Sequence, residues 1–187
     1  LAVGALTLIT LAVFLVLTKA ALTVALAVMV LGTAALDRRH ALPPLTFFIQ
    51  IAVAIITFRL VIWPGFDWAL GWDYSAEVYV IGYFEVAFAY LATLALLAAA
   101  WWLSRDRRIK TALVLESACW TILGVFLAVT LLRVAPRSAS DSHWVMGLMS
   151  TIWIALALNQ LYRMQKGGKL ITVLRAIVGG LYGLIAL

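Results

Sequence analysis

Charged residues are scarce in this chain: Asp, Glu, Lys and Arg together make up 12% of its 187 residues. A soluble domain has about a quarter of its residues charged, so this chain has too few charges for an ordinary water-facing surface. Hydrophobic residues reach 66%, and the mean hydropathy is +1.09. The composition therefore argues against a soluble domain and predicts a membrane protein.

Cysteine and histidine are also rare, which limits the chemistry that this chain can carry. The lone Cys119 lies in an apolar run, where we expect it to pack as a small hydrophobic side chain. His40 and His143 fall in loops that the topology below places on opposite sides of a membrane, so they cannot share a metal ion. HExxH, Walker-type and GxSxG motifs are absent from the sequence. We predict no catalytic residue, no metal and no cofactor, although an enzyme is not excluded.

Long apolar runs fill most of the chain. A helix rises about 1.5 Å per residue and the hydrocarbon core of a bilayer is about 30 Å thick, so a span needs about 20 apolar residues. The runs lack the alternation of barrel strands, which favours helices. We predict an all-α, polytopic transmembrane helical bundle that forms a single region, 1–187. It has about seven spans, at residues 1–17, 20–36, 45–63, 78–103, 111–132, 144–162 and 170–187.

The first of these boundaries and the two chain ends depend on length. Residues 1–36 contain one charge, Lys19, and a single helix of that length would measure about 54 Å, so we expect two spans there. The chain begins at Leu1 and both of its ends lie in apolar runs. We expect it to be a piece of a longer chain.

Basic residues alternate between the loops and predict the topology. Loops 37–44, 104–110 and 163–169 contain nine Lys or Arg, whereas loops 63–77 and 133–143 contain two. The positive-inside rule places the first group in the cytoplasm and the second group outside. This distribution also explains the net charge of +6 without nucleic acid as a partner.

The segment TFRLVIWPGFDWALGWDYSAE, residues 57–77, illustrates the predicted outer interface. Pro64 is expected to end the third span. Trp63 directly before it, and Trp68 and Trp72 after it, lie at the level where amphipathic rings collect. Arg59 lies just inside the apolar run and needs a separate explanation.

Charged residues inside spans are costly, so they usually pair or line a cavity. Arg59 and Glu85 fall at similar depths on neighbouring spans, and Glu116 and Arg175 do so nearer the cytoplasm. We predict these two ion pairs inside the bundle. Three polar residues are possible neighbours of the pairs: Gln50, Arg133 and Asn159. The pairs either clamp helices together or line a polar cavity, and the sequence leaves both interpretations open.

Small residues indicate where helices approach closely. Gly179 and Gly183 form a GxxxG spacing, and a second stripe comprises Ser117, Thr121, Gly124 and Ala128. Such residues let helix backbones come together in a membrane. Packing within this chain and dimerisation are both compatible with the pattern.

The order of several motifs resembles a known family. Residues 22–70 contain an apolar helix that ends in LDRR, a proline shortly after it, a helix that ends in RL, and a proline-glycine followed by an aromatic residue. LVLESACW at 113–120 and DSHWVMGLMSTIWIALALNQLYR at 141–163 are also similar. The chain resembles the bacterial predicted-membrane-protein family called domain-of-unknown-function family 2339. The resemblance implies an uncharacterised polytopic inner-membrane protein with further spans, and it transfers no catalytic residue.

These observations favour an integral membrane protein of the bacterial inner membrane that acts as a scaffold or assembly component. Its expected partners are membrane lipids and other membrane-protein segments or subunits. The alternative is a transporter, or a protein that handles lipids or glycans, which would use the intramembrane charges. A membrane-embedded enzyme is a third interpretation.

Overall fold

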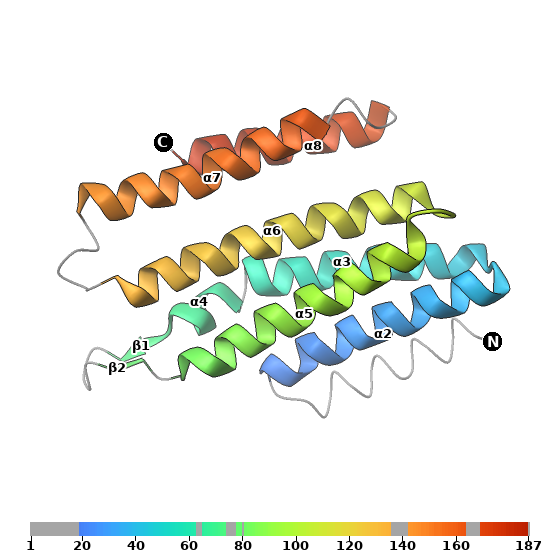
Figure 1. Cartoon of the computed structure of the whole chain (residues 1–187), viewed down its shortest axis with the longest axis horizontal. Helices are drawn as coiled ribbons and strands as arrows, with labels where there is room; N and C mark the ends of the chain where they lie inside the picture. The colour runs from blue at the N-terminus through green and yellow to red at the C-terminus, as the bar shows by residue number, and fades with distance from the viewer. Residues whose placement is uncertain are drawn as a thin grey trace. The chain divides into compact units, whose positions relative to one another are not determined.

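The structure, a computed structural model, describes residues 19–62, 65–73, 78–79, 81–135, 142–163 and 169–186. The predicted first span, 1–17, lies outside the described residues. The described part is all-α apart from one short strand pair (Figure 1). Its elements are α2 (Lys19–His40), α3 (Pro43–Val61), α4 (Gly65–Leu70), β1 (Trp72–Asp73), β2 (Val78–Tyr79), α5 (Tyr83–Ser104), α6 (Ile109–Val134), α7 (His143–Arg163) and α8 (Lys169–Ile185).

Within the described residues, five stretches are long and apolar enough to cross a membrane: Ala21–His40, Pro43–Leu70, Tyr83–Ser104, Ile109–Val134 and His143–Tyr162. They coincide with the second to sixth predicted spans, so this is a multi-pass membrane protein. The predicted last span also forms a helix, α8, but it has 17 residues. The expected number of about seven spans is therefore matched only roughly.

The turn between α2 and α3 is fixed by local backbone chemistry. Ala41 has a positive φ of 51°, and its N–H donates to the carbonyl of Asp37 at 2.8 Å. This left-handed conformation closes the last turn of α2. Pro43 then begins α3, at a position where the missing N–H of proline has no intrahelical role.

The outer end of α3 differs from the sequence prediction. The expected helix over 45–63 ends at Val61, and the predicted loop 63–77 contains the short helix α4 and the strand β1. A Cβ on Gly65 would lie 2.7 Å from the Cα of Leu60 and 3.1 Å from the carbonyl carbon of Arg59. Only glycine lets α4 begin this close to the end of α3.

The predicted helix over 78–103 starts too early. Val78 and Tyr79 form β2, which pairs antiparallel with β1 in the register Trp72 to Tyr79 and Asp73 to Val78. Gly82 is extended, with φ −62° and ψ 142°, and α5 begins at Tyr83. Because valine and tyrosine favour strands and glycine disfavours helix, the apolar run VYVIG did not extend the helix as its hydropathy suggested.

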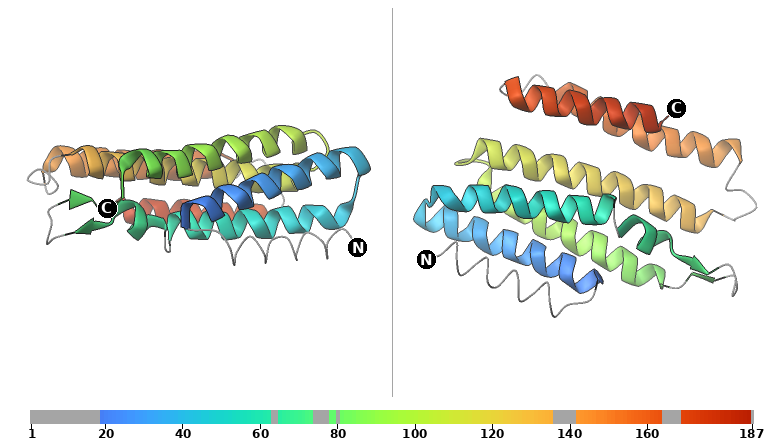
Figure 2. Two further views of the ribbon diagram at one scale, coloured as in Figure 1. Left: turned by 90° about the horizontal axis from the view of Figure 1, so that it is seen from below. Right: turned by 180° about the vertical axis from the view of Figure 1, so that it is seen from behind.

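The chain divides into two compact units, Leu1–Leu123 and Gly124–Leu187, with the boundary inside α6. In the first unit, α2 packs against both α3 and α5 (Figure 1, Figure 2). The largest fully buried side chains there include Leu26 on α2, Ile49 and Ile56 on α3, and Tyr90 and Leu97 on α5. These residues form the core of the helix layer.

The second unit is built on close contacts of small and aromatic residues. α7 packs against α8, and the rings of Trp153 and Tyr182 lie 5.6 Å apart. A Cβ on Gly179 would lie 3.4 Å from the carbonyl oxygen of Ala157, so one glycine of the GxxxG spacing serves this α7–α8 packing. On α6, Gly124 faces Leu156 of α7, whose Cγ would lie 2.9 Å from an added Cβ.

Candidate functional site

Polar side chains in the first unit gather in two layers, one near each end of the helices. The outer layer lies where α3 ends. Arg59 Nε donates a hydrogen bond to Thr23 Oγ1 of α2 at 3.2 Å. Tyr90 of α5 donates its hydroxyl to the carbonyl of Leu60 at 2.8 Å. Leu60 belongs to the last turn of α3, where carbonyls have no intrahelical donor, so Tyr90 satisfies a group that would otherwise be buried without a partner.

Glu85, the predicted partner of Arg59, lies nearer the end of its helix than the sequence predicted. Because α5 begins at Tyr83, Glu85 is in its first turn, not eight residues deep, and its side chain is exposed. An acid at that position is favoured by the positive end of the helix dipole. The structure joins half-buried Arg59 to Thr23, and the Arg59–Glu85 pair stays a prediction.

The predicted Glu116–Arg175 pair stays a prediction. Glu116 is half-buried on α6 in the first unit. Arg175 belongs to α8 in the second unit, and its side chain lies outside the described residues. Arg133 and Asn159 are half-buried on α6 and α7 within the second unit.

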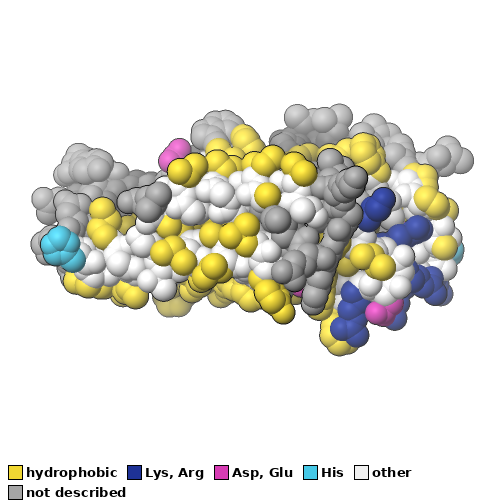
Figure 3. Space-filling view, turned by 90° about the horizontal axis from the view of Figure 1, so that it is seen from above, with side chains coloured by type: hydrophobic (Ala, Val, Ile, Leu, Met, Phe, Trp, Pro, Cys, Tyr) yellow, Lys and Arg dark blue, Asp and Glu magenta, His cyan; other side chains and the backbone are white. Residues whose placement is uncertain are grey.

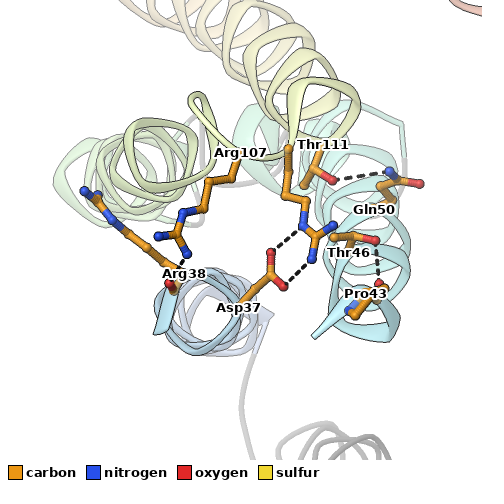
Figure 4. Close-up of polar contacts among 8 residues, drawn as sticks. Asp37, Arg38, Pro43, Thr46, Gln50, Arg107 and Thr111 are labelled. Carbon is orange, nitrogen blue, oxygen red and sulfur yellow. Dashed lines mark hydrogen bonds and ion pairs between the residues drawn. The ribbon is translucent and has the colours of Figure 1, made fainter. Parts of the chain in front are cut away.

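The inner layer lies at the opposite ends of the same helices and includes residues that the sequence analysis did not single out (Figure 4). Gln50 of α3, a predicted neighbour, donates through Nε2 to Thr111 Oγ1 of α6 at 3.5 Å. Arg107 donates through Nη1 to the carbonyl of Arg38 at 2.7 Å. The Arg107–Arg38 contact joins loops 37–44 and 104–110, which the charge distribution also predicts to lie on one side of the membrane.

The strongest contact of the inner layer is an ion pair between Asp37 and Arg108. Arg108 Nε and Nη2 lie 2.9 Å and 3.1 Å from the two carboxylate oxygens of Asp37, a bidentate geometry. Asp37 is buried, with 5% of its surface exposed. The hydrogen bonds that Arg108 donates to Asp37, together with the negative charge of Asp37, raise the pKa of Arg108 above its ordinary value despite partial desolvation. Asp37 occupies the last turn of α2, where a helix disfavours an acid, so the cation compensates an otherwise unfavourable position.

The sequence does contain a signal that could have identified Asp37 as a member of an ion pair. Asp37 is the one acid of loop 37–44, and the loop predicted on the same side contains Arg105, Arg107, Arg108 and Lys110. By their charge alone, these residues indicate only the topology. Which arginine meets Asp37 depends on the packing of α2 against α5, and no local pattern encodes that choice.

Two further hydroxyl groups lie within the helix layer of the first unit. The Oγ1 atoms of Thr57 on α3 and Thr93 on α5 are buried and have no hydrogen-bond partner in the described part of the chain. Thr57 lies three residues before Leu60 on α3, and Thr93 lies three residues after Tyr90 on α5. At about 1.5 Å per residue, both threonines lie about 4.5 Å deeper along their helices than the Tyr90–Leu60 bond. Buried hydroxyls without a hydrogen-bond partner are uncommon in folded proteins.

Neither a metal-binding cluster in the described residues nor a similarity to known proteins assigns a function to this chain. Among the described residues, no group of three or more His, Cys, Asp or Glu side chains gathers to hold a metal ion. Comparisons with protein-family models, curated proteins and solved structures find no match to this chain. The resemblance to domain-of-unknown-function family 2339 therefore stays a prediction.

Proposed function

We propose that this protein is a scaffold or assembly component of the bacterial inner membrane, with other membrane-protein segments or subunits as its partners. One observation carries the proposal: the polar side chains of the first unit bind one helix to another. Arg59 binds α2, Tyr90 binds α3, and Gln50 reaches α6. This is the arrangement expected of clamps that fix helix packing.

The second unit contributes a face on which another helix could pack. Gly180 of α8 is exposed, Gly183 is half-exposed, and a Cβ added to either would meet nothing within 4 Å. Ala176 lies one turn before Gly180. Because small residues allow helix backbones to approach closely in a membrane, this face of α8 supports binding of a membrane partner.

Native mass spectrometry of the complete protein, extracted with its own lipids, tests the proposal. We expect a defined complex with at least one other chain. Gly180→Leu should remove that chain because the side chain would block close helix approach. Gly32→Leu is the matched control, since Gly32 is also exposed on a helix with no atom within 4 Å of an added Cβ. A bare monomer, or a complex unaffected by Gly180→Leu, would contradict the proposal.

The alternative, a transporter, is favoured by Thr57 and Thr93, whose buried hydroxyls have no hydrogen-bond partner among the described residues. A polar pathway would need such groups. Thr57→Val with Thr93→Val distinguishes the functions. A scaffold should keep its partners and become equally or more stable, whereas a transporter should lose transport of its substrate in proteoliposomes.

A further inference from the structure

Basic side chains cluster at the inner end of the first unit, in the segments 37–40 and 104–110. Together these segments contain six Lys or Arg and two Asp, a net charge of +4. Figure 3 shows Lys and Arg side chains gathered in one area, with apolar side chains beside them. Five of the six basic side chains are exposed: Arg38, Arg39, Arg105, Arg107 and Lys110. We call these five the basic surface.

The fold holds the basic surface in place through contacts that use few of its charges. Arg108, the sixth cation, is paired with Asp37 and is 28% exposed, so it acts as an anchor beneath the surface. Arg107 is attached to α2 by its bond to the carbonyl of Arg38, and a carbonyl does not neutralise a guanidinium. The segments therefore keep their positive charges close together despite mutual repulsion.

The second acid, Asp106, is exposed and neutralises little of this charge. Arg105 Nε lies 3.5 Å from Asp106 Oδ1, with side-chain exposures of 39% and 70%. Exposed pairs of this kind are weak because water and salt screen them. The guanidinium of Arg105 is instead positioned over the ring of Trp102, 3.5 Å from its centroid.

Apolar side chains border the basic surface. Trp102 is 55% exposed and Ile109 is 69% exposed. Trp102 lies two residues before Ser104, and Ile109 is next to Lys110 along the chain. Tryptophan at the end of a span marks the headgroup level of a bilayer. A ligand that fits both parts of this surface needs an anionic group for the cations and acyl chains for the apolar border.

We propose that the basic surface binds the headgroups of anionic phospholipids in the adjacent leaflet, with Trp102 and Ile109 contacting their acyl chains. Juxtamembrane Lys and Arg residues attract anionic lipids electrostatically. The exposed apolar border argues for a lipid over a soluble anion or a nucleic acid, neither of which would contact it. This binding does not depend on the proposed scaffold function.

The test is a titration of the purified full chain with phosphatidylglycerol and, separately, with phosphatidylcholine, followed by native mass spectrometry. We expect tighter binding of phosphatidylglycerol, which weakens as salt is added. Arg38→Gln with Arg39→Gln should reduce the affinity by about fivefold for each charge removed. Arg38→Lys with Arg39→Lys keeps both charges and should bind nearly as the parent does.

A variant that is expected to bind the lipid more tightly distinguishes an effect of charge from a loss of folding. Asp106→Asn removes an exposed acid from the segment and should increase the affinity for phosphatidylglycerol, by less than the about fivefold expected for each basic charge because water and salt screen Asp106. Circular dichroism should show the same helix content in all variants. Glycerol phosphate, which has the anionic group without acyl chains, should compete only at far higher concentrations.

Three results would overturn the proposal. They are equal binding of the two lipids, an unchanged affinity in the Gln double variant, and effective competition by glycerol phosphate at concentrations matching the lipid.

Discussion

Tyr90 and Asp37 show how individual polar residues contribute to this apolar fold. Tyr90 is fully buried and uses its hydroxyl to satisfy a carbonyl in the last turn of α3. Asp37 is buried at the other end of the layer and meets Arg108. Both residues join elements far apart in the sequence, so each one restricts which helices can be neighbours.

Tyr90→Phe should destabilise the protein by about 0.5–2 kcal/mol, because the ring still fits but the Leu60 carbonyl loses its donor. Thermal or SDS unfolding in micelles measures the change. Tyr162→Phe is the matched control, since Tyr162 is 69% exposed and its stability effect should be close to zero. Equal effects of the two substitutions would show that the Tyr90–Leu60 bond contributes nothing.

Ala41→Gly should stabilise the turn between α2 and α3. A residue with a Cβ in the left-handed region costs about 1–2 kcal/mol, whereas glycine adopts the observed φ of 51° at the cost of about 0.4–1 kcal/mol of unfolded-state entropy. The net gain should be about 0.5 kcal/mol, seen as a higher midpoint in the same unfolding assay. A lower midpoint would argue against a left-handed Ala41.

At the scale of elements, the junction of α3 and α4 is a tightly packed corner of the described chain. α3 ends at Val61 and α4 begins at Gly65, against the backbone of Arg59 and Leu60. The same corner carries Arg59 and the carbonyl that Tyr90 binds. A shift of α4 would therefore also disturb the outer polar layer.

Gly65→Ala should destabilise the protein by about 1–3 kcal/mol, the usual cost of overpacking, because the obstructing atoms are backbone and cannot rotate away. Gly32→Ala is the control: it lies within α2 with open space around it and should stabilise the helix by about 0.5–1 kcal/mol. The unfolding free energies of both variants in one micelle system measure this contrast. Two effects of the same sign would refute the close approach at Gly65.

For the whole molecule, the arrangement of loops connects the fold with its membrane. Arg107 contacts the backbone of Arg38, so the ends of α2 and α5 and the start of α6 share one side. α6 runs from Ile109 to Val134, which at about 1.5 Å per residue is long enough to reach the other side of the hydrocarbon core.

Labelling of single cysteines tests this topology in intact cells or vesicles. With Cys119→Ala as background, His40→Cys and Asp106→Cys should react with an impermeant maleimide from the same side. Phe84→Cys and Ser142→Cys should react only from the opposite side. Under the positive-inside rule, the first two should be protected in intact cells. Labelling of His40→Cys and Phe84→Cys from one side would contradict the orientation of α5 relative to α2.

The sequence by itself determined the class of the protein and the approximate positions of the described helices, because hydropathy over about 20 residues is a local property. It also separated basic from base-poor loops. The contacts of the polar residues were decided by tertiary structure. Moving the start of α5 from residue 78 to Tyr83 shifts the helix start by about 7.5 Å, which leaves Glu85 in the first turn. Asp37 and Arg108, 71 positions apart in the chain, meet because α2 packs on α5, and side-chain packing between helices sets that neighbourhood.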